Sequence, residues 1–237
     1  MYLHESEWNP KRILLKYVKT GKTNLRQFCQ NVIFMNFLAH LLLSGEKDGI
    51  IMGNYVGDFI KGKLTDDKTA NWNQEYVIGL KLHRFIDMFT DSHPIVREAK
   101  YKVAEVHGRL AGIITDIYFD YFLAKNFLEI HHETLWEYSH RMYSVIEKNE
   151  YLIPEQMIPM VRSMVRQDWL NSYATFEGID LTFNRMSRRA GFMGSIKNAA
   201  AELEKNEAFY QEKFNTFFPD LREKSSAYIS DSLALLG

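Results

Sequence analysis

A chain of 237 residues with 46% hydrophobic and 14% aromatic side chains can bury a substantial core, which excludes global disorder. The net charge of −1 excludes a whole-chain attraction to nucleic acid, and a single cysteine, Cys29, excludes an internal disulfide and a cysteine-based zinc site. The longest apolar run, VIFMNFLAHLLL, is shorter than the roughly 20 residues of a membrane-spanning helix, and no secretion signal is visible. We therefore expect a soluble cytoplasmic protein without a nucleic-acid or membrane partner.

Residues 1–34 differ in charge from the rest of the chain. They hold six Lys/Arg against two Asp/Glu, a balance of +4, whereas the remaining 23 Lys/Arg and 28 Asp/Glu give −5. Little apolar periodicity is present, and Met35 opens the segment MNFLAHLLLSG. We interpret 1–34 as a peripheral N-terminal extension, either a basic arm or, as we favour, an addition upstream of the native fold.

From residue 35 to 237 the pattern favours one all-α domain, because proline is scarce and no stretch alternates as a strand would. Apolar residues recur at helical spacing over 76–90, and Ser92 with Pro94 is typical of a helix cap and first turn. The segment 109–127 is apolar on most sides, which predicts a central helix. Further helices are predicted over 133–149, 154–172, 176–190, 194–214 and 219–235. Pro154 and Pro219 stand at the predicted starts of the second and the last of these.

Ionisable residues recur at helical spacing inside two of these apolar segments. In LHRFIDMFTDSHP, His83 and Asp87 stand four apart on one helix face, and Asp91 continues the row. In TDIYFDYFLA, Asp116 and Asp120 repeat the spacing. An unpaired buried carboxylate is costly, and a divalent cation removes that cost. Imidazole and carboxylate ligands without thiolates suit Mn²⁺, Fe²⁺, Zn²⁺ or Mg²⁺. Two earlier candidate ligands are His40 and Asp58.

Each residue also has a purely structural interpretation. A lone histidine on an apolar helix is more often a hydrogen-bonded core residue than a ligand. Asp91 with Ser92 and Pro94 is explained by helix capping, and Asp58 after Gly57 by a turn. An exposed i,i+4 pair contributes only about 0.2–0.5 kcal/mol. Two acidic i,i+4 pairs on strongly apolar helices are together harder to explain as solvated faces.

The motifs resemble, in order, those of the acyl carrier protein phosphodiesterase family. The similar segments are MNFLAHLLLSG, GNYVGDFIKG, GLKLHRFIDMFTDSHP, RLAGIITDIYFDYFLA, FNRMSRRAGF and FNTFFPDL, covering about residues 35–222. The resemblance implies an all-helical fold related to the HD-domain metal phosphohydrolases. It also implies release of 4′-phosphopantetheine from holo-acyl carrier protein with a divalent metal, typically Mn²⁺.

Carried over by position, the resemblance implies metal or catalytic roles for His40, Asp58, His83, Asp87 and Asp120. Asp116 and Asp91 are secondary candidates. Asp58 or Asp87 would orient the attacking water or take its proton, and Arg84 would contact phosphate. The family often has histidine at the positions of Leu42 and Tyr121, so the ligand count stays open.

The implied partner is acidic, which predicts a basic docking surface. The best candidate is RMSRR, with Arg185, Arg188 and Arg189, helped by Arg162, Arg166 and Lys197. For any single arginine, a solvated helix face is the commoner explanation. Three functions remain open: an acyl carrier protein phosphodiesterase, an HD-type hydrolase of a nucleotide or other small phosphodiester, and a non-catalytic binding protein with a decayed site.

Overall fold

The computed structural model describes residues 36–189, 196 and 198–236, and of Arg189 the backbone alone. Within these ranges every regular element is a helix and there is no strand, which confirms the all-α prediction. The described helices belong to one compact unit. The predicted extension 1–34, Lys197 and the Arg189 side chain lie outside the description. No described helix combines the length and the apolar character needed to cross a membrane.

Eight helices of eight or more residues carry most of the described fold. They are α4 (Asp48–Tyr55), α6 (Gln74–Ser92), α7 (Pro94–His107), α8 (Ala111–Lys125), α10 (Leu135–Lys148), α11 (Ile158–Arg166), α13 (Phe176–Arg189) and α15 (Glu207–Ala234). The shorter helices are α3 (Phe37–Leu42), α5 (Asp66–Thr69), α9 (Phe127–His131), α12 (Trp169–Ser172) and α14 (Ala199–Lys205). Single 3₁₀ turns are η2 (Gly57–Phe59), η3 (Gly108–Leu110), η4 (Glu150–Leu152) and η5 (Glu155–Met157).

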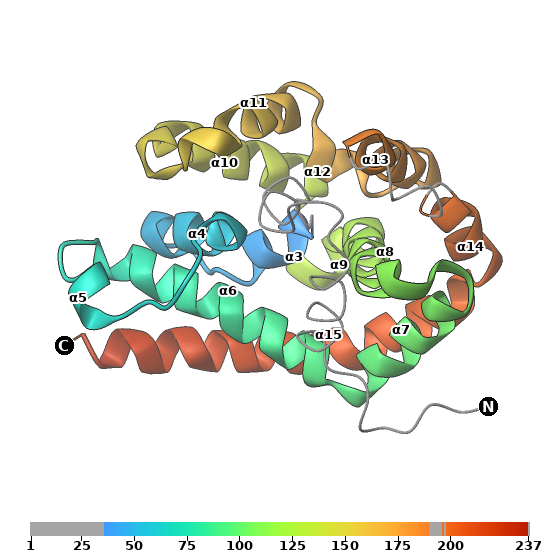
Figure 1. Ribbon diagram of the computed structural model, residues 1–237, viewed down its shortest axis with the longest axis horizontal. Helices are drawn as coiled ribbons and strands as arrows, with labels where there is room; N and C mark the ends of the chain where they lie inside the picture. The colour runs from blue at the N-terminus through green and yellow to red at the C-terminus, as the bar shows by residue number, and fades with distance from the viewer. Residues whose placement is uncertain (1–35, 190–195, 197, 237) are drawn as a thin grey trace, which may run out of the picture. The chain divides into compact units, whose positions relative to one another are not determined.

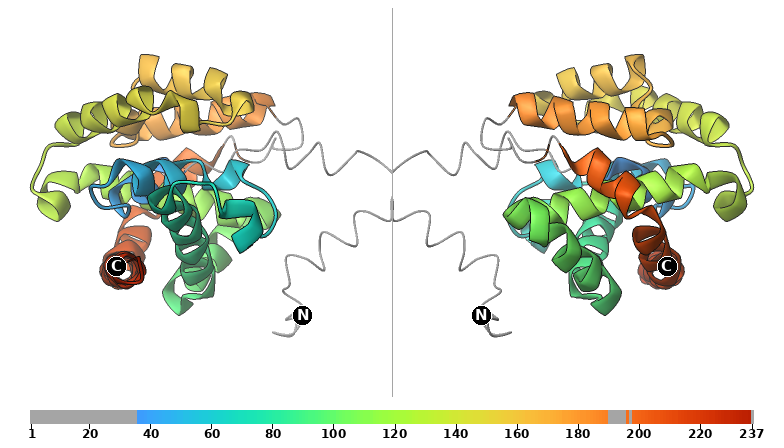
Figure 2. Two further views of the ribbon diagram at one scale, coloured as in Figure 1. Left: turned by 90° about the vertical axis from the view of Figure 1, so that its left-hand side faces the viewer. Right: turned by 90° about the vertical axis from the view of Figure 1, so that its right-hand side faces the viewer.

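Helices α3 and α4 lie between two groups of helices (Figure 1). Helices α10 and α11 cover one side, and α6 and α15 run along the other, an order that the perpendicular views repeat (Figure 2). Helix α6 packs on α4, α7 and α15, and α8 packs on α3, α7 and α15. Helix α3 thus packs on α8, and its His40 side chain approaches Asp87 of α6.

Helix α8 forms the centre of the core, as its sequence predicted. Ile114, Ile117, Tyr118, Phe122 and Leu123 have no exposed surface, although they point in different directions around the helix. A helix buried on nearly all sides leaves no solvated face for its polar residues, so the carboxylates of α8 need partners inside the protein.

Glycines let α4 approach α6 closely. A Cβ on Gly53 would lie 3.0 Å from the Cα of Gly79, and a Cβ on Gly57 would overlap the imidazole of His83. Gly53 and Gly57 are four residues apart, as are Gly79 and His83, so the close contact continues for one turn along both chains. The absence of side chains at these positions therefore places α4 directly against α6, and the start of η2 directly against His83.

Three predicted helix boundaries were wrong. The predicted helix 194–214 is divided at Asn206, whose φ of −118° and ψ of 25° leave the helical conformation and separate α14 from α15; its residues 194, 195 and 197 lie outside the description. The predicted helix 154–172 is broken at Asp168, whose left-handed φ of 46° separates α11 from α12. Pro219 does not start a helix but lies inside α15, which runs unbroken from residue 207 to 234. Because Phe214, Phe217, Phe218 and Leu221 are buried around the proline, packing on both sides outweighs the lost backbone hydrogen bond.

The start of α7 also differs by one residue from its predicted cap. Ser92 is the last residue of α6, and His93 occupies the N-cap position before Pro94 at the first position of α7. The proline acts as predicted, since its missing N–H would be unpaired at a helix start in any case.

Candidate metal centre

His40 lies on α3 with 3% of its surface exposed, and Asn54 of α4 holds its ring. Nδ1 of His40 lies 2.7 Å from Oδ1 of Asn54. The amide nitrogen of Asn54 donates to the His40 carbonyl and to Ser44, which fixes the amide orientation. Oδ1 of Asn54 therefore faces the ring as an acceptor, so Nδ1 of His40 carries the proton and Nε2 keeps a lone pair.

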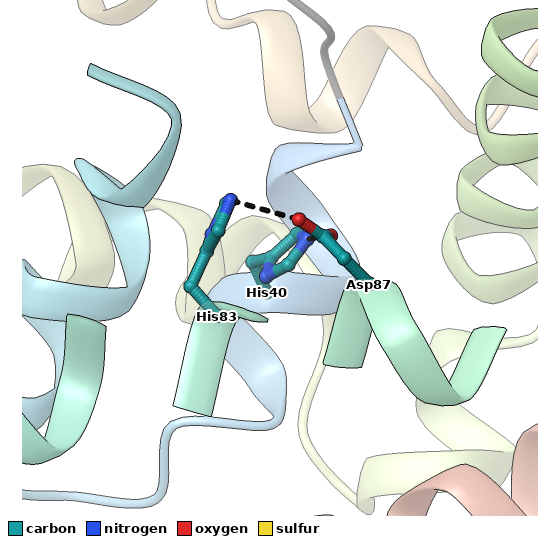
Figure 3. Close-up of side chains that lie close together, drawn as sticks. All are labelled: His40, His83 and Asp87. Atoms are coloured by element: carbon teal, nitrogen blue, oxygen red, sulfur yellow. Dashed lines mark ion pairs between the residues drawn. The ribbon is translucent and has the colours of Figure 1, made fainter. Parts of the chain in front are cut away.

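The imidazole of His83, on α6, is held by the backbone carbonyl of Asn54. Its Nδ1 donates to the Asn54 carbonyl oxygen at 2.8 Å, so its Nε2 also keeps a lone pair. The two imidazoles stack with ring centroids 4.2 Å apart (Figure 3). Both Nε2 atoms are buried and have no hydrogen-bond partner. Two such orphan acceptors side by side are unusual in a protein interior.

Asp87, one turn after His83 on α6, faces both orphan nitrogens (Figure 3). Its Oδ1 lies 3.4 Å from Nε2 of His40, and its Oδ2 lies 3.4 Å from Nε2 of His83. Oδ1 of Asp58, in η2, lies 3.6 Å from Nε2 of His83. The Asp87 side chain is 50% exposed, so the group opens to solvent on this side.

Electrostatic interactions shift the pKa values within this group in opposite directions. Burial alone would lower the pKa of His83, but the neighbouring carboxylates of Asp58 and Asp87 raise it above its ordinary value. Burial alone would raise the pKa of Asp87, but the neighbouring imidazoles of His40 and His83 and the charge of Lys100 lower it overall. Asp87 therefore stays ionised and stabilises positive charge at His83.

The donor set fits a divalent cation. One ligand atom each from His40, His83 and Asp87 lie within 4.8 Å of one another. Ligands held at about 2.1 Å in a tetrahedron stand about 3.4 Å apart, which is the separation seen between Asp87 and each Nε2. Metal-bound histidine also donates its second ring N–H to a carbonyl or carboxylate, and Asn54 accepts both.

Asn54 is the important site residue that the sequence analysis missed. It is fully buried and contacts both histidines, one through its side chain and one through its backbone. The available signal was its place in GNYVGD, four residues before Asp58, among otherwise apolar or small residues. A buried amide without an obvious partner predicts a hydrogen-bonding role, although not which one.

The predicted ligand Asp120 lies outside this group. Its Oδ2 accepts a hydrogen bond from the N–H of Leu38 and its Oδ1 one from the N–H of Ala39, each at 3.0 Å. Asp120 therefore caps the first turn of α3, the helix that carries His40. Asp116, one turn earlier on α8, is also outside the group. Burial raises the pKa of its carboxyl to about 7; the charge of Lys100 opposes this rise, and the charges of Asp87 and Asp91 add to it. Their ligand roles stay predictions.

Arg84 and Asp91 are directed to other partners. Nη2 of Arg84 donates to the carbonyls of Ile60 and Gly62 at 3.1 and 2.7 Å, and thereby holds the segment that follows Asp58. Asp91 forms an ion pair with Lys100. Arg84 thus has a positioning role in this structure, and its predicted phosphate contact stays a prediction.

The basic segment RMSRR lies on α13, and its arginines differ in their surroundings. Arg185 donates to Gln167 at 2.6 Å and stacks on Trp169, whereas Arg188 is exposed. Of the predicted helpers, Arg162 pairs with Glu150 and Arg166 is exposed. Within the described residues, Arg188 and Arg166 are therefore the cations of this set that are open to a partner.

Comparisons with known proteins point to one family. Residues 35–221 match the acyl carrier protein phosphodiesterase family. A protein named acyl carrier protein phosphodiesterase from Photorhabdus laumondii is 31% identical over 192 residues, which is 81% of this chain and 95% of that protein. One of the same name from Pectobacterium atrosepticum is 28% identical over 190 residues, 80% of this chain and 96% of that protein. No solved structure was found to be similar.

The matched range contains both acidic helices, the buried histidines and the asparagine that holds them. Relatives are covered almost from end to end, so the similarity extends well beyond one motif. By the extent of the match, this chain belongs to the acyl carrier protein phosphodiesterase family.

Proposed function

We propose that this protein is a metal-dependent phosphodiesterase that hydrolyses the link between 4′-phosphopantetheine and holo-acyl carrier protein, leaving the apo form. The observation that carries the proposal is the pair of buried, unpartnered Nε2 atoms of His40 and His83 facing Asp87. The substrate is inferred from the names of relatives that share about four fifths of this chain.

The residues that would hold the cation are His40, His83 and Asp87, with Asp58 beside them. Two imidazoles and one or two carboxylates without a thiolate suit Mn²⁺, which is the metal we propose. When bound, a divalent cation supplies Lewis-acid chemistry, which polarises the phosphoryl group and lowers the pKa of a water molecule. Asp116 and Asp120 are weaker ligand candidates because neither belongs to the close group.

Asp58 is the proposed general base. Its side chain is 27% exposed, its Oδ1 lies near Nε2 of His83, and it can accept a proton from the attacking water. The new bond joins the water oxygen to phosphorus, and the bond from phosphorus to the oxygen of the carrier's serine breaks. That serine oxygen takes up the proton that Asp58 accepted, so both products leave with a complete set of protons. Arg84 holds the backbone after Asp58, so it positions the base without touching it. Asp87 is the alternative base, since half of its side chain faces solvent.

Release of phosphopantetheine from holo-acyl carrier protein, followed by mass spectrometry, tests this proposal directly. Activity should be lost with EDTA, return with Mn²⁺, and be abolished in His40→Ala and His83→Ala. His140→Ala is the matched control, because His140 is exposed and its Nδ1 contacts the Trp136 carbonyl in another part of the fold. It should keep wild-type turnover.

Two outcomes would contradict the proposal. If nucleotides or other small phosphodiesters were cleaved while holo-carrier was not, the protein would be a small-phosphodiester hydrolase. If neither class were cleaved with any divalent metal, the group would belong to a binding protein without activity.

A further inference from the structure

The segment that follows Asp58 contains two lysines that the proposed mechanism does not use. Lys61 and Lys63 are exposed, and no hydrogen bond or ion pair joins either ammonium group to another described residue. Gly62, between them, has a left-handed φ of 85°, and a Cβ there would meet no atom within 4 Å beyond its chain neighbours. This side of the segment is therefore open to solvent and to a partner.

Two cations hold the backbone of the same segment in place. Arg84 of α6 donates to the carbonyls of Ile60 and Gly62. Nζ of Lys68, on α5, donates to the Lys61 carbonyl at 3.0 Å. Three consecutive carbonyls thus bind positively charged side chains. A carbonyl group is a neutral acceptor, so these bonds fix the segment without neutralising either cation.

Lysines without an ion pair gather around this segment. Within the described residues, the lysines that form no ion pair are Lys61, Lys63, Lys68, Lys81 and Lys205. All but Lys205 lie between residues 61 and 81, and Lys81 stands one turn before Arg84 on α6. Residues 61–84 hold five Lys/Arg against three Asp/Glu, a balance of +2, although the balance of residues 35–237 is −5.

The bond that is cleaved in the proposed reaction requires docking at the edge of the metal centre. Only Oγ and Cβ of the serine separate phosphorus from the carrier backbone, whereas the phosphopantetheine arm extends from the other side of phosphorus. The surface of the carrier must therefore lie against this edge when phosphorus reaches the cation. Lys61 is three residues after Asp58, so the Cα atoms of the two residues lie within about 11 Å of each other.

We propose that Lys61 and Lys63 form a docking surface for the acidic carrier at the edge of the metal centre, with Lys81 beside them. The inference rests on the proposed function, because the partner is the carrier substrate. Positive charge at this edge attracts the carrier and steers its modified serine toward the centre. Since Arg84 and Lys68 already hold the segment, little further ordering is needed on docking. This surface is additional to RMSRR, which lies on α13.

The first test measures docking without turnover. Fluorescently labelled apo-acyl carrier protein is titrated with the full-length protein in EDTA, and binding is followed by anisotropy. The wild type should bind, and Lys61→Glu combined with Lys63→Glu should weaken binding about tenfold, because repulsion replaces attraction at two positions. Rising salt should weaken wild-type binding, and the double variant should show a shallower salt dependence, which structural damage alone would not produce.

Lys205→Glu combined with Lys224→Glu is the matched control. It changes the net charge by the same amount, Lys205 has no ion pair either, and the Lys224 side chain is 55% exposed. This variant should bind the carrier as the wild type does. An equal loss of affinity in both double variants would show that total charge governs binding, and would overturn the docking surface.

The second test is turnover. Lys61→Glu combined with Lys63→Glu should raise KM for holo-acyl carrier protein about tenfold with kcat kept, because the lysines act on association. Hydrolysis of bis(4-nitrophenyl) phosphate should match the wild type, which shows that the metal centre is intact. Wild-type KM and carrier affinity in this variant would overturn the docking surface and leave the proposed function standing. A wild-type protein that neither binds nor cleaves the carrier would instead overturn the proposed function, so the two failures are distinguishable.

Discussion

The backbone carbonyl of Asn54 accepts a hydrogen bond from Nδ1 of His83, while the side chain of Asn54 holds His40. One residue of α4 therefore fixes the tautomers of two histidines from two other helices. Because a ligating histidine needs its second nitrogen fixed by such a partner, Asn54 would control the proposed metal site without touching the cation.

Asn54→Ala should weaken Mn²⁺ binding by about 10–100-fold, the usual effect of removing an outer-shell partner of metal ligands. The variant loses the acceptor for His40 but keeps the backbone carbonyl for His83, so binding should weaken without vanishing. Isothermal titration calorimetry measures the change. Asn126→Ala is the control, because it removes an amide that bonds to Phe122 and Gln211. Equal losses of affinity in both variants would contradict the role of Asn54.

Gly57→Ala should damage the same site through sterics. Its Cβ would overlap the ring of His83, so either η2 or His83 must shift. We expect a lower melting temperature and weaker Mn²⁺ binding, with a cost of about 1–3 kcal/mol as for other overpacked sites. Gly112→Ala is the matched control, because nothing lies within 4 Å of its Cβ position in α8. It should be neutral or stabilising, since alanine is the better helix former. Unchanged metal binding in Gly57→Ala would contradict the close-contact argument.

The sequence predicted those parts of the site that lie on one helix. His83 and Asp87 share a face because four-residue spacing requires it, and the structure places them together. His40 is 43 residues away from His83, so its approach depends on packing that periodicity does not encode. The role of Asn54 depends partly on a backbone carbonyl, which every residue has and no motif reveals. Asp120 shows the opposite limit: an acidic i,i+4 pattern looks the same whether a carboxylate binds a metal or caps a helix.

In the fold, too, features set by one helix were predictable from the sequence, and features set by long-range packing were not. Apolar periodicity located α6 and α8 and indicated that α8 is central, because the burial of a helix is visible in its own residues. Pro219 misled the prediction, because local proline chemistry favours a helix start while four buried residues hold α15 continuous through it. Long-range packing decided that boundary, and a single sequence does not record it.

Mn²⁺ affinity should rise with pH through and above pH 6.5. The pKa of His83 is raised above its ordinary value, so a proton competes with the metal for Nε2 at higher pH than for an isolated histidine. Below that raised pKa, each pH unit should change the affinity by about tenfold for one released proton. Equilibrium dialysis at pH 6, 7 and 8 measures the slope, and His131→Gln, outside the group, should keep it. A flat profile would exclude His83 as a ligand.

Asp120 should make the metal-free protein less stable as pH rises. Burial raises its pKa to about 7, although the N–H groups of Ala39 and Leu38 oppose the rise. An unfolded aspartate titrates near 3.9, so the folded state binds the proton more tightly. Unfolding therefore releases a proton between these values, and the free energy of unfolding should fall from about pH 4 to about pH 7 and then level off.

Urea unfolding of wild-type and Asp120→Asn protein at pH 5, 6.5 and 8, in EDTA, tests this expectation. The stability of the wild type relative to Asp120→Asn should decrease with pH, because the asparagine does not titrate. Parallel stability curves would show that the pKa of Asp120 is ordinary in the folded state. Asp120→Ala should in addition weaken Mn²⁺ binding, because it leaves the first turn of α3 uncapped and α3 carries His40.

The final prediction concerns the basic segment RMSRR and the acidic carrier. Reversing charge in Arg188→Glu combined with Arg189→Glu should raise KM for holo-acyl carrier protein about tenfold with little change in kcat, because a charge pair across an interface mainly affects association. The wild-type reaction should also slow as salt rises, since exposed charges are screened over about 8–10 Å at 0.10–0.15 M.

Two controls separate docking from structural damage. Lys205→Glu reverses another exposed charge, at the end of α14, and should leave KM unchanged. Hydrolysis of bis(4-nitrophenyl) phosphate needs the metal centre but no docking surface, so neither salt nor the double reversal should affect it. If the double variant slowed the small substrate and the carrier equally, the segment would act through the fold. If Lys205→Glu raised KM as much, total charge would explain the effect, and the arginines of α13 would not form a docking surface.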